Sequence, residues 1–545
     1  MLDPCHPRTE AGEIVARHIR APSASGAKLI DPPLECVPKL LEANAACQGR
    51  CEYDFGGRRL GRLATEARQE LVREAARYTS SYRDVPDALE GKRILLAGHQ
   101  PQMFHPGVWF KNFVLGRLAE AHDAVGVNLV IDSDTIKSVS VRVPKGDVKA
   151  PLMESIEFDR PGPIVPFEER PILDRDTLTA FGNRVGQTLV SAIHEPLVQQ
   201  YWPLVLERAG ETNNLGNCLA QARHQLEGHW GLRTLEFPQS HVCQLEAFHW
   251  FTAHLLAHLP RLWTVYNEAV AQYRRAYKLR SANHPVPDLA QDGDLLEAPY
   301  WIWTAEAPQR CRLFVGVRDN ELLLTNRAGW EARLPAGPEA DLTRAAAVLA
   351  DLAAQGIKLR TRALITTLFG RLLLGDLFLH GIGGGKYDEL TDLLMARFFD
   401  LEPPRFMVIS GTLHLPVTQE NVKADDVRRI DHLLRELEFH PERWLEPGSP
   451  SEAKSIDNWG AQKRRWIDTP ASPSNARART RAIRQANDEL QPYLAERRQQ
   501  LLVERSTIVE HLRARSVWSS RDYAFCLYPE QALRNFLLDF PTAKP

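Results

Sequence analysis

The feature that most constrains the fold is an apolar segment, residues 94–97, that leads through a glycine-containing loop into a helix-like segment. The loop begins at Gly98 and contains His99 and Gln100. Pro106 suits the first turn of a helix, where a missing N–H costs nothing, and the residues after it place apolar side chains on one broad face. This order predicts a strand, a loop and a helix that packs on a sheet.

A second apolar segment, residues 125–131, follows this helix and ends at Asp132 and Asp134. Strand–helix–strand connections of this length are nearly always parallel and right-handed, so both strands should end at the same edge of one sheet. Open α/β sheets bind their ligands at that edge. We therefore expect His99 and the two aspartates to line a ligand site, although any one of them, taken alone, is more often an ordinary loop residue or a turn cap.

A third strand-like segment, residues 377–382, leads into Gly383–Gly385 and Lys386. Glycines before a helix let backbone N–H groups approach an anion at the positively polarised helix start. The spacing matches neither the phosphate loop of nucleotide hydrolases nor the dinucleotide-binding fingerprint. The glycines alone fit either a tight turn or an anion site, and the adjacent His380 and Lys386 favour the anion site.

Length and composition limit the classes of protein that this chain can belong to. Its 545 residues are too many for one ordinary core, and its formal net charge is only −2. The length favours several domains or one core with large insertions. The balanced charge gives no reason to expect nucleic acid or an anionic membrane as a partner. Because no apolar run is long enough to span a bilayer and the start of the chain lacks a secretory signal, we expect a cytoplasmic protein.

The pattern along the chain predicts an α/β protein built around a parallel-sheet core with large helical insertions. The expected regions are an N-terminal arm (1–60), the first half of the core (61–173), a helical insertion (174–290), a small β meander (291–345), the second half of the core (346–454), a coiled-coil-like helical arm (455–515) and a tail that docks on the core (516–545).

The late helical region, residues 455–515, is highly charged and carries a narrow apolar seam. The seam residues are Ile483, Leu490, Leu494, Leu501, Ile508 and Leu512, at spacings of 7, 4, 7, 7 and 4. These spacings are typical of a helix that packs against another helix. The partner is either a helix of the same chain or that of a second copy in a homodimer, and the alternative is a solvated helix that lies on its own domain.

Metal binding has little support in the sequence. Cys47 and Cys51 form the single close cysteine pair, and one such pair is a weak signal for zinc. His254 and His258 share a helical face, but the glutamate of the zinc hydrolase motif is absent. We therefore predict no metal site.

Together these motifs resemble the cysteine-adding enzyme family of bacillithiol biosynthesis, as a distant relative. The likeness rests on their order along most of the chain: the loop near residue 98, the acidic strand end near 132, the Tyr266-Asn267 pair, the glycine turn near 384, the late helix and the Tyr-Pro-Glu tail. The resemblance implies a Rossmann-like core with helical connecting segments and a coiled-coil arm used for dimerisation. It also implies amide formation between an amino acid and the amine of a sugar conjugate.

The family's motifs can be placed on this chain residue by residue. Its Gly-Gln-Gln loop falls on Gly98–Gln100, its Glu-Asp-His-Asp strand end on Asp132–Asp134 and its glycine turn on Gly383–Gly385. Here His99 replaces a glutamine, the histidine of the acidic motif is missing, and Gly385 and Lys386 replace the proline and acid of the turn. These differences concern the identity of the substrates more than the fold.

Joining a carboxylate to an amine in water requires an activated carboxylate and an unprotonated amine. As catalytic residues, we expect Asp132 or Asp134 to orient or deprotonate the amine and His99 to carry its proton. Lys386 and the glycine amides would hold an anionic phosphate or carboxylate. ATP could supply the activation, although no specific nucleotide motif is present.

The substrate-binding or anion-binding candidates are the glycine and polar residues of these loops, with the Tyr-Asn pair that the resemblance indicates. They are Gly98, Gln100, His105, Lys111, Tyr266, Asn267, His380, Gly383, Gly384, Gly385, Lys386 and Tyr387. Two alternative functions use the same residues differently. One is a nucleotidyl or glycosyl transferase that binds a nucleotide at the loops, and the other is a dimeric scaffold without catalytic activity.

Overall fold

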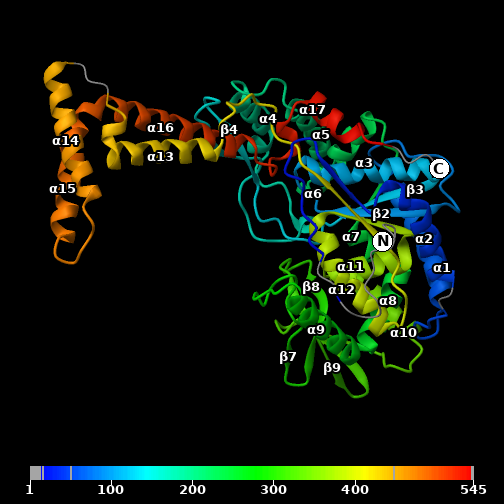
Figure 1. Ribbon diagram of the computed structural model, residues 1–545. Helices are drawn as coiled ribbons and strands as arrows, with labels where there is room; N and C mark the ends of the chain where they lie inside the picture. The colour runs from blue at the N-terminus through cyan, green and yellow to red at the C-terminus, as the bar shows by residue number, and fades with distance from the viewer. Residues whose placement is uncertain (1–13, 15–16, 50–51, 446–448, 542–545) are drawn as a thin grey trace. The chain divides into compact units, whose positions relative to one another are not determined.

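The computed structural model describes residue 14 and residues 17–49, 52–445 and 449–541 (Figure 1). The chain forms two compact units. We call residues 1–143, 154–414 and 521–545 the core unit, and residues 144–153 and 415–520 the arm unit.

A six-stranded sheet lies at the centre of the core unit, with the order β1-β14-β13-β2-β3-β6. Its strands are β1 (Lys28–Asp31), β2 (Arg93–His99), β3 (Ala124–Val130), β6 (Leu235–Pro238), β13 (Leu377–His380) and β14 (Phe406–Gly411). Strand β1 is antiparallel to β14, and the other neighbours are parallel. The predicted α/β class with a parallel sheet is therefore confirmed.

The order of the parallel strands identifies where the chain reverses its direction across the sheet. Numbered along the chain, these strands lie in the order 3-2-1-4-5. The chain moves from β2 to β3 and β6 in one direction, and then returns to place β13 on the other side of β2. Connections that leave two neighbouring strands in opposite directions open a crevice at the carboxyl ends of those strands. In this protein the crevice is expected between the ends of β2 and β13.

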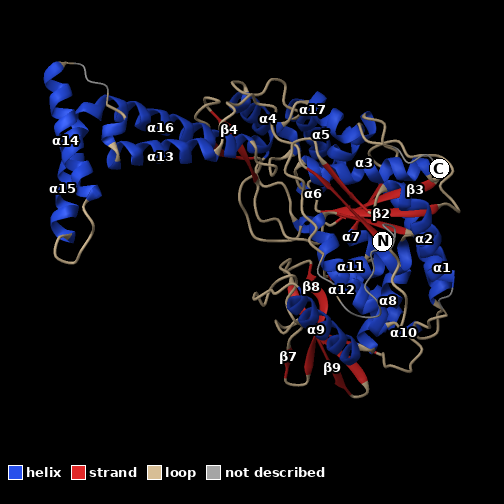
Figure 2. Cartoon of the chain, in the orientation of Figure 1, coloured by secondary structure: helices blue, strands red, loops and turns tan. Residues whose placement is uncertain are grey.

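Helices cover both faces of this sheet (Figure 2). Helix α3 (Pro106–Ala121) packs on β2, β3 and β14, and α12 (Ile382–Phe398) packs on β13 and β14. Around them lie α1 (Val37–Gly49), α2 (Leu60–Ser80), α11 (Ala363–Phe369) and α17 (Glu530–Leu538). Helix α17 packs against α3 through the rings of Phe536 and Phe110, which places the end of the chain on the core unit.

Residues 174–290 are mainly helical, but they also contribute strand β6 to the central sheet. The helices are α4 (Arg175–Leu189), α5 (Val198–Glu211), α6 (Leu215–His229), α7 (Gln239–Val242), α8 (Glu246–Ala257) and α9 (Leu259–Ala276). The predicted helical insertion therefore also supplies β6, a strand that the sequence pattern did not indicate. This strand has only four residues, all of them buried, and one is Glu236, so it has neither the length nor the apolar pattern of a recognisable strand.

A second, antiparallel sheet follows, with the order β11-β10-β9-β8-β12 and with β7 paired to β8. Its strands are β7 (Gln291–Asp292), β8 (Leu295–Thr304), β9 (Cys311–Arg318), β10 (Glu321–Thr325), β11 (Glu331–Leu334) and β12 (Ile357–Thr361), and α10 (Thr343–Ala354) precedes β12. The predicted meander thus extends to residue 361, beyond its expected end at 345.

A small hairpin, β4 (Ser140–Lys145) and β5 (Leu152–Glu157), lies earlier in the chain.

In its described residues the arm unit has four α-helices, and the last three of them occupy the region 455–515 where one long helix was predicted. They are α13 (Ala424–Phe439), α14 (Pro450–Asp468), α15 (Ala476–Leu490) and α16 (Ala495–Trp518). Prolines at 470, 473 and 492 separate the last three, since a proline cannot continue a helix interior. The seam residues Leu494, Leu501 and Ile508 pack against α13 of the same chain.

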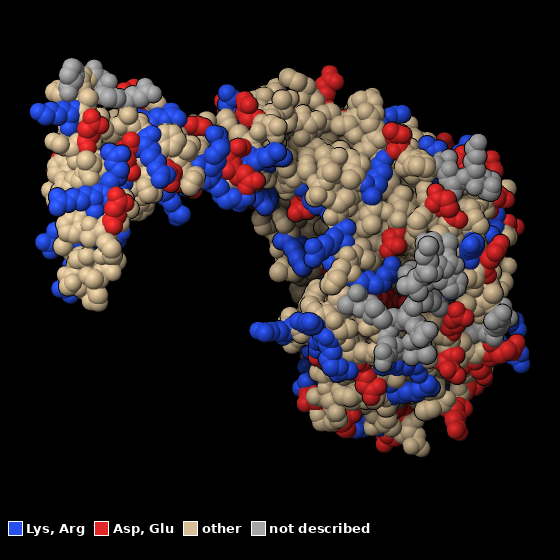
Figure 3. All heavy atoms as spheres, viewed as in Figure 1, with Lys and Arg blue, Asp and Glu red and all other residues tan. Residues whose placement is uncertain are grey.

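Within the described ranges, no helix is both long enough and apolar enough to cross a bilayer. On the face shown in Figure 3, acidic side chains lie among the basic ones along the arm helices.

Candidate functional site

A cavity of about 660 Å³ lies at the carboxyl ends of β2 and β13, where the strand order places the crevice. Small-molecule sites typically measure roughly 300 to 1,000 Å³. The sequence-predicted residues that line it are Gly98, His99, Gln100, His105, Lys111, His380, Gly383, Gly384, Lys386 and Tyr387. These residues are far apart in the sequence, and the parallel sheet brings them to one edge.

Two helices begin at this cavity. Helix α3 starts at Pro106, and its N-cap residue His105 accepts a hydrogen bond through Nδ1 from the Gly107 N–H, at 3.1 Å. Helix α12 starts at Ile382, directly after β13, so Gly383 and Gly384 belong to its first turn. The first N–H groups of a helix have no partner within the helix and attract anions. The cavity wall at both helix starts can therefore hold negative charge.

The glycines of α12 also have a packing role. A Cβ atom at Gly385 would lie 2.4 Å from a methyl carbon of Val408 on β14. Glycine therefore lets the helix approach the sheet closely, and Gly385 is absent from the cavity wall. The prediction that Gly385 binds an anion is replaced by this packing role.

Lys111 is almost fully buried in the second turn of α3, with 2% of its surface exposed. Its Nζ donates a hydrogen bond to the Gly98 carbonyl oxygen, and no acidic side chain pairs with it in the described part of the chain. Burial, together with the positive charge of Arg223, lowers the pKa of Lys111 to about 7. Near neutral pH this amine can therefore hold or release a proton, and an anion in the cavity would favour its charged form.

His99 is a weaker base than its predicted role of proton carrier requires. Its ring lies edge-on to Phe104, with centroids 4.8 Å apart. Burial and the nearby charge of Lys111 lower its pKa to about 3. Because such a weak base stays unprotonated at neutral pH, His99 is poorly suited to the predicted role of carrying a proton from the amine. It can still bind substrate as a neutral hydrogen-bonding group.

Neither predicted aspartate lines the cavity. The Asp132 carboxylate accepts hydrogen bonds from the backbone N–H of Ser240, at 2.9 Å, and from its hydroxyl group. Burial raises the pKa of Asp132 to about 7. Asp132 therefore braces the start of α7, and its carboxylate lies outside the cavity wall in which the sequence placed it.

Asp134 contacts a residue of the cavity wall but does not itself line the cavity. It accepts a hydrogen bond from the Gln100 side-chain amide, at 3.0 Å, and pairs with Arg310 at 3.2 Å. Gln100 lines the cavity, so Asp134 orients a cavity residue without entering the cavity itself. The predicted direct contact of Asp134 with the amine is replaced by this indirect one.

The Tyr-Asn pair lies away from the cavity, on α9. Tyr266 is buried in the core. The Asn267 side chain exchanges hydrogen bonds with the backbone of Leu289, at 2.8 and 3.0 Å. Both residues stabilise the fold, and their predicted role in substrate binding is not supported by their position.

Sequence patterns did not identify several cavity residues from the two ends of the chain. These are Ile19, Arg20, Ala21, Arg521 and Asp522. The Arg521 guanidinium donates to the carbonyl oxygen of Gly411, at 2.9 Å, and to the hydroxyl group of Ser410. Burial lowers the pKa of Arg521. No local periodicity marks these residues, because only the folded core brings the chain ends to the sheet edge.

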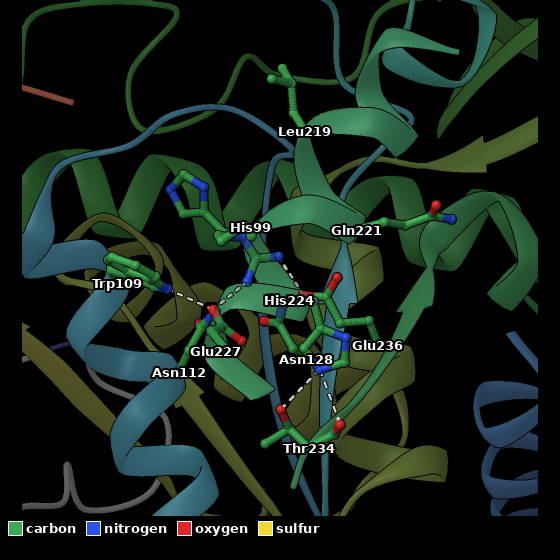
Figure 4. Close-up of polar contacts among 12 residues, drawn as sticks. His99, Trp109, Asn112, Asn128, Leu219, Gln221, His224, Glu227, Thr234 and Glu236 are labelled. Atoms are coloured by element: carbon green, nitrogen blue, oxygen red, sulfur yellow. Dashed lines mark hydrogen bonds and ion pairs between the residues drawn. The ribbon is translucent and has the colours of Figure 1, made fainter. Parts of the chain in front are cut away.

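A buried charge network lies near His99, around Arg223 (Figure 4). Arg223 on α6 pairs with Glu227, at 2.5 Å, and with Glu236 on β6. Glu227 also accepts hydrogen bonds from Trp109 and Asn112 of α3, at 2.6 and 2.9 Å. The network therefore connects α3, which carries Lys111, to α6 and β6.

Comparison of the chain with family models and with curated proteins found no match. Among the residues that the structure describes, no group of three or more histidine, cysteine, aspartate or glutamate side chains is arranged to hold a metal ion.

Proposed function

We propose that the cavity binds small-molecule substrates and that the protein is a carbon–nitrogen ligase. Its reaction would join the carboxylate of an amino acid to the amine of a sugar or a similar acceptor. The observation that carries the proposal is the position of the cavity, at the point where the chain reverses direction in a 3-2-1-4-5 parallel sheet. Rossmann-like folds have this strand order, and they bind their ligands where this cavity lies. They support a Rossmann-like core and a distant relationship to the cysteine-adding enzyme family.

The charges around the cavity suit the chemistry of amide formation. A carboxylate must be activated before an amine can displace its oxygen, and ATP is the proposed activator. Lys386 and the start of α12 would hold a phosphate at one end, and Arg521 and the start of α3 would hold a carboxylate at the other. The transferase alternative would use the same helix starts for a sugar nucleotide.

A ligand-stabilisation screen followed by a turnover assay tests this proposal. We expect ATP, L-cysteine or glucosamine to raise the melting temperature, because a ligand at a hundred times its Kd stabilises a protein by about 2.7 kcal/mol. Lys386→Ala should reduce the shift with ATP, whereas Lys454→Ala, at an exposed position of α14, should leave it unchanged. Mass spectrometry should detect an amide product from the mixture of all three compounds.

The alternatives predict different results in the same experiment. Stabilisation by sugar nucleotides but not by amino acids, without an amide product, would favour the transferase. A protein that none of these compounds stabilises would contradict the ligase and favour a scaffold.

We further propose that the arm unit pairs with that of a second copy. Its seam is already covered by α13, but other large apolar side chains of the arm are exposed: Phe439, Trp444, Ile467, Tyr493, Leu502 and Val503. We take these side chains as the surface that a second copy would cover, since apolar groups left in solvent are the ones whose burial favours association.

Charged substitutions on the arm should separate the proposed dimer. The double variant Leu502→Glu/Val503→Glu should halve the mass measured by light scattering, since two buried carboxylates would oppose association. Val317→Glu, at an exposed position of β9 in the core unit, is the matched control. A wild-type protein that is monomeric at micromolar concentration would contradict the dimer.

A further inference from the structure

His380 is held rigidly in the cavity wall at the end of β13. Its ring stacks on Phe378, with centroids 4.4 Å apart and an interplanar angle of 19°, and meets Phe406 edge-on at 5.1 Å. Only 4% of the side chain is exposed. The plane of the ring is therefore fixed by packing.

The two nitrogen atoms of His380 face different surroundings. Nε2 lies 2.9 Å from a carboxylate oxygen of Asp388 on α12. Nδ1 faces Gly384, since a Cβ atom at that position would lie 2.9 Å from it. Gly384 lines the cavity, so Nδ1 lies at the cavity wall, whereas the buried Nε2 makes no hydrogen bond to any described residue. The missing side chain at Gly384 thus leaves Nδ1 accessible to a ligand.

Asp388 is suited to orienting the imidazole. It is fully buried and also pairs with Arg371 at 2.7 Å. Burial alone would raise the pKa of Asp388, but the charge of Arg371 holds that pKa well below its usual range. A permanently ionised carboxylate beside Nε2 favours a proton on that nitrogen through its charge and leaves the Nδ1 lone pair free, although the two groups are not aligned for a hydrogen bond.

We propose that His380 is the catalytic base that accepts the proton of the amine substrate through Nδ1, and that Asp388 is its positioning residue. This inference rests on the proposed ligase function. As the amine nitrogen bonds to the carbonyl carbon of the ATP-activated carboxylate, the bond from that carbon to the phosphate-bearing oxygen breaks. The phosphate group departs with the electron pair of that bond, and the amine proton moves to Nδ1.

The other basic groups of the cavity are less suitable for this step. The pKa of His99 is lowered to about 3, so it binds a proton too weakly. Lys111 donates a hydrogen bond to the Gly98 carbonyl oxygen and lies on α3, whereas His380 lies beside the start of α12, where the phosphate is proposed to bind. His380 is thus placed beside the phosphate of the activated carboxylate.

The tautomer of His380 can be measured without turnover. In ¹⁵N-histidine-labelled protein, we expect one resonance pair with a protonated Nε2 and an unprotonated Nδ1, absent from His380→Gln but present in His122→Gln. His122 lies at the opposite end of α3 and is the matched control. Asp388→Asn should shift the population toward the Nδ1–H tautomer. A wild-type Nδ1–H tautomer, or no change in Asp388→Asn, would overturn the proposed dyad.

Turnover provides the second readout. His380→Gln should lower kcat by roughly 10² to 10⁴ while KM for the amine changes little, since general-base catalysis contributes about that factor. Added imidazole should partly restore the rate of His380→Gly. If wild-type protein makes no amide, the ligase function fails even where the tautomer is as expected. If wild-type protein makes amide and His380→Gln keeps the full rate, the base assignment fails and the ligase function stands.

Discussion

Replacing Lys111 by methionine is expected to stabilise the protein near neutral pH while removing the binding of anionic ligands. The pKa of Lys111 falls from 10.5 to about 7 on folding. Below pH 7 both folded and unfolded chains hold the proton, and burial of the charge then costs the folded state roughly 3 to 5 kcal/mol. Methionine has a similar length and no charge, so the variant should gain most of that free energy of unfolding at pH 6.

The pH dependence of this gain distinguishes a buried charge from a change in packing. Between about pH 7 and 10.5 the unfolded state binds more protons at this position, so the stability of the wild type rises with pH relative to the variant. The difference in free energy of unfolding, measured with urea at pH 6 and pH 10, should therefore shrink. Lys454→Met, at an exposed site, should show no such trend. A constant difference between Lys111→Met and wild type would contradict the lowered pKa.

A substitution that raises stability but removes ligand binding usually marks a residue that serves function. If Lys111 served only the fold, its removal would leave the ligand-induced stabilisation intact. We expect instead that Lys111→Met loses the melting-temperature shift with ATP or L-cysteine.

The sequence predicted the unit from β2 through α3 to β3 well, because its evidence is local. Alternating strand, loop and helix patterns locate His99 and Lys111 within one connection, and parallel strands must share an edge. The direction of a side chain beyond a strand end, by contrast, depends on residues that are distant in the sequence. Asp132 follows β3 as predicted, yet Ser240, from a connection more than a hundred residues later, determines where its carboxylate points.

The difference between local and long-range evidence also explains why the helices of the arm and the cavity residues near the chain ends were not predicted correctly. The apolar seam correctly indicated that Leu501 packs against another helix, because helical periodicity defines a buried face. It could not indicate whether that helix is α13 or belongs to another copy, since both satisfy the same spacing. The seam also extended across proline positions that end the helices. Arg20 and Arg521 reach the cavity only through long-range packing, which no periodicity records.

The largest loss of stability is expected from Arg223→Met in the network of Figure 4. Arg223 is the guanidinium that neutralises the buried carboxylates of Glu227 and Glu236. Removing one partner of a buried ion pair costs about 3 to 5 kcal/mol, because the remaining charge stays buried without compensation. Arg505→Met breaks a half-exposed pair with Asp431 in the arm and should cost far less, because solvent screens an exposed pair.

A compensating substitution tests whether unpaired charge is the cause of this loss. Arg223→Met/Glu236→Gln should recover part of the stability, since glutamine keeps the hydrogen bond from Asn128 without the charge. The single variant should also lose stability as pH rises. Burial already raises the pKa of Glu236 to about 7 with Arg223 in place. Without Arg223 the folded state would bind still more protons than the unfolded state above pH 4.5. Equal destabilisation of Arg223→Met at pH 5 and pH 8, with no recovery in the double variant, would mean that Arg223 acts through packing and not through charge.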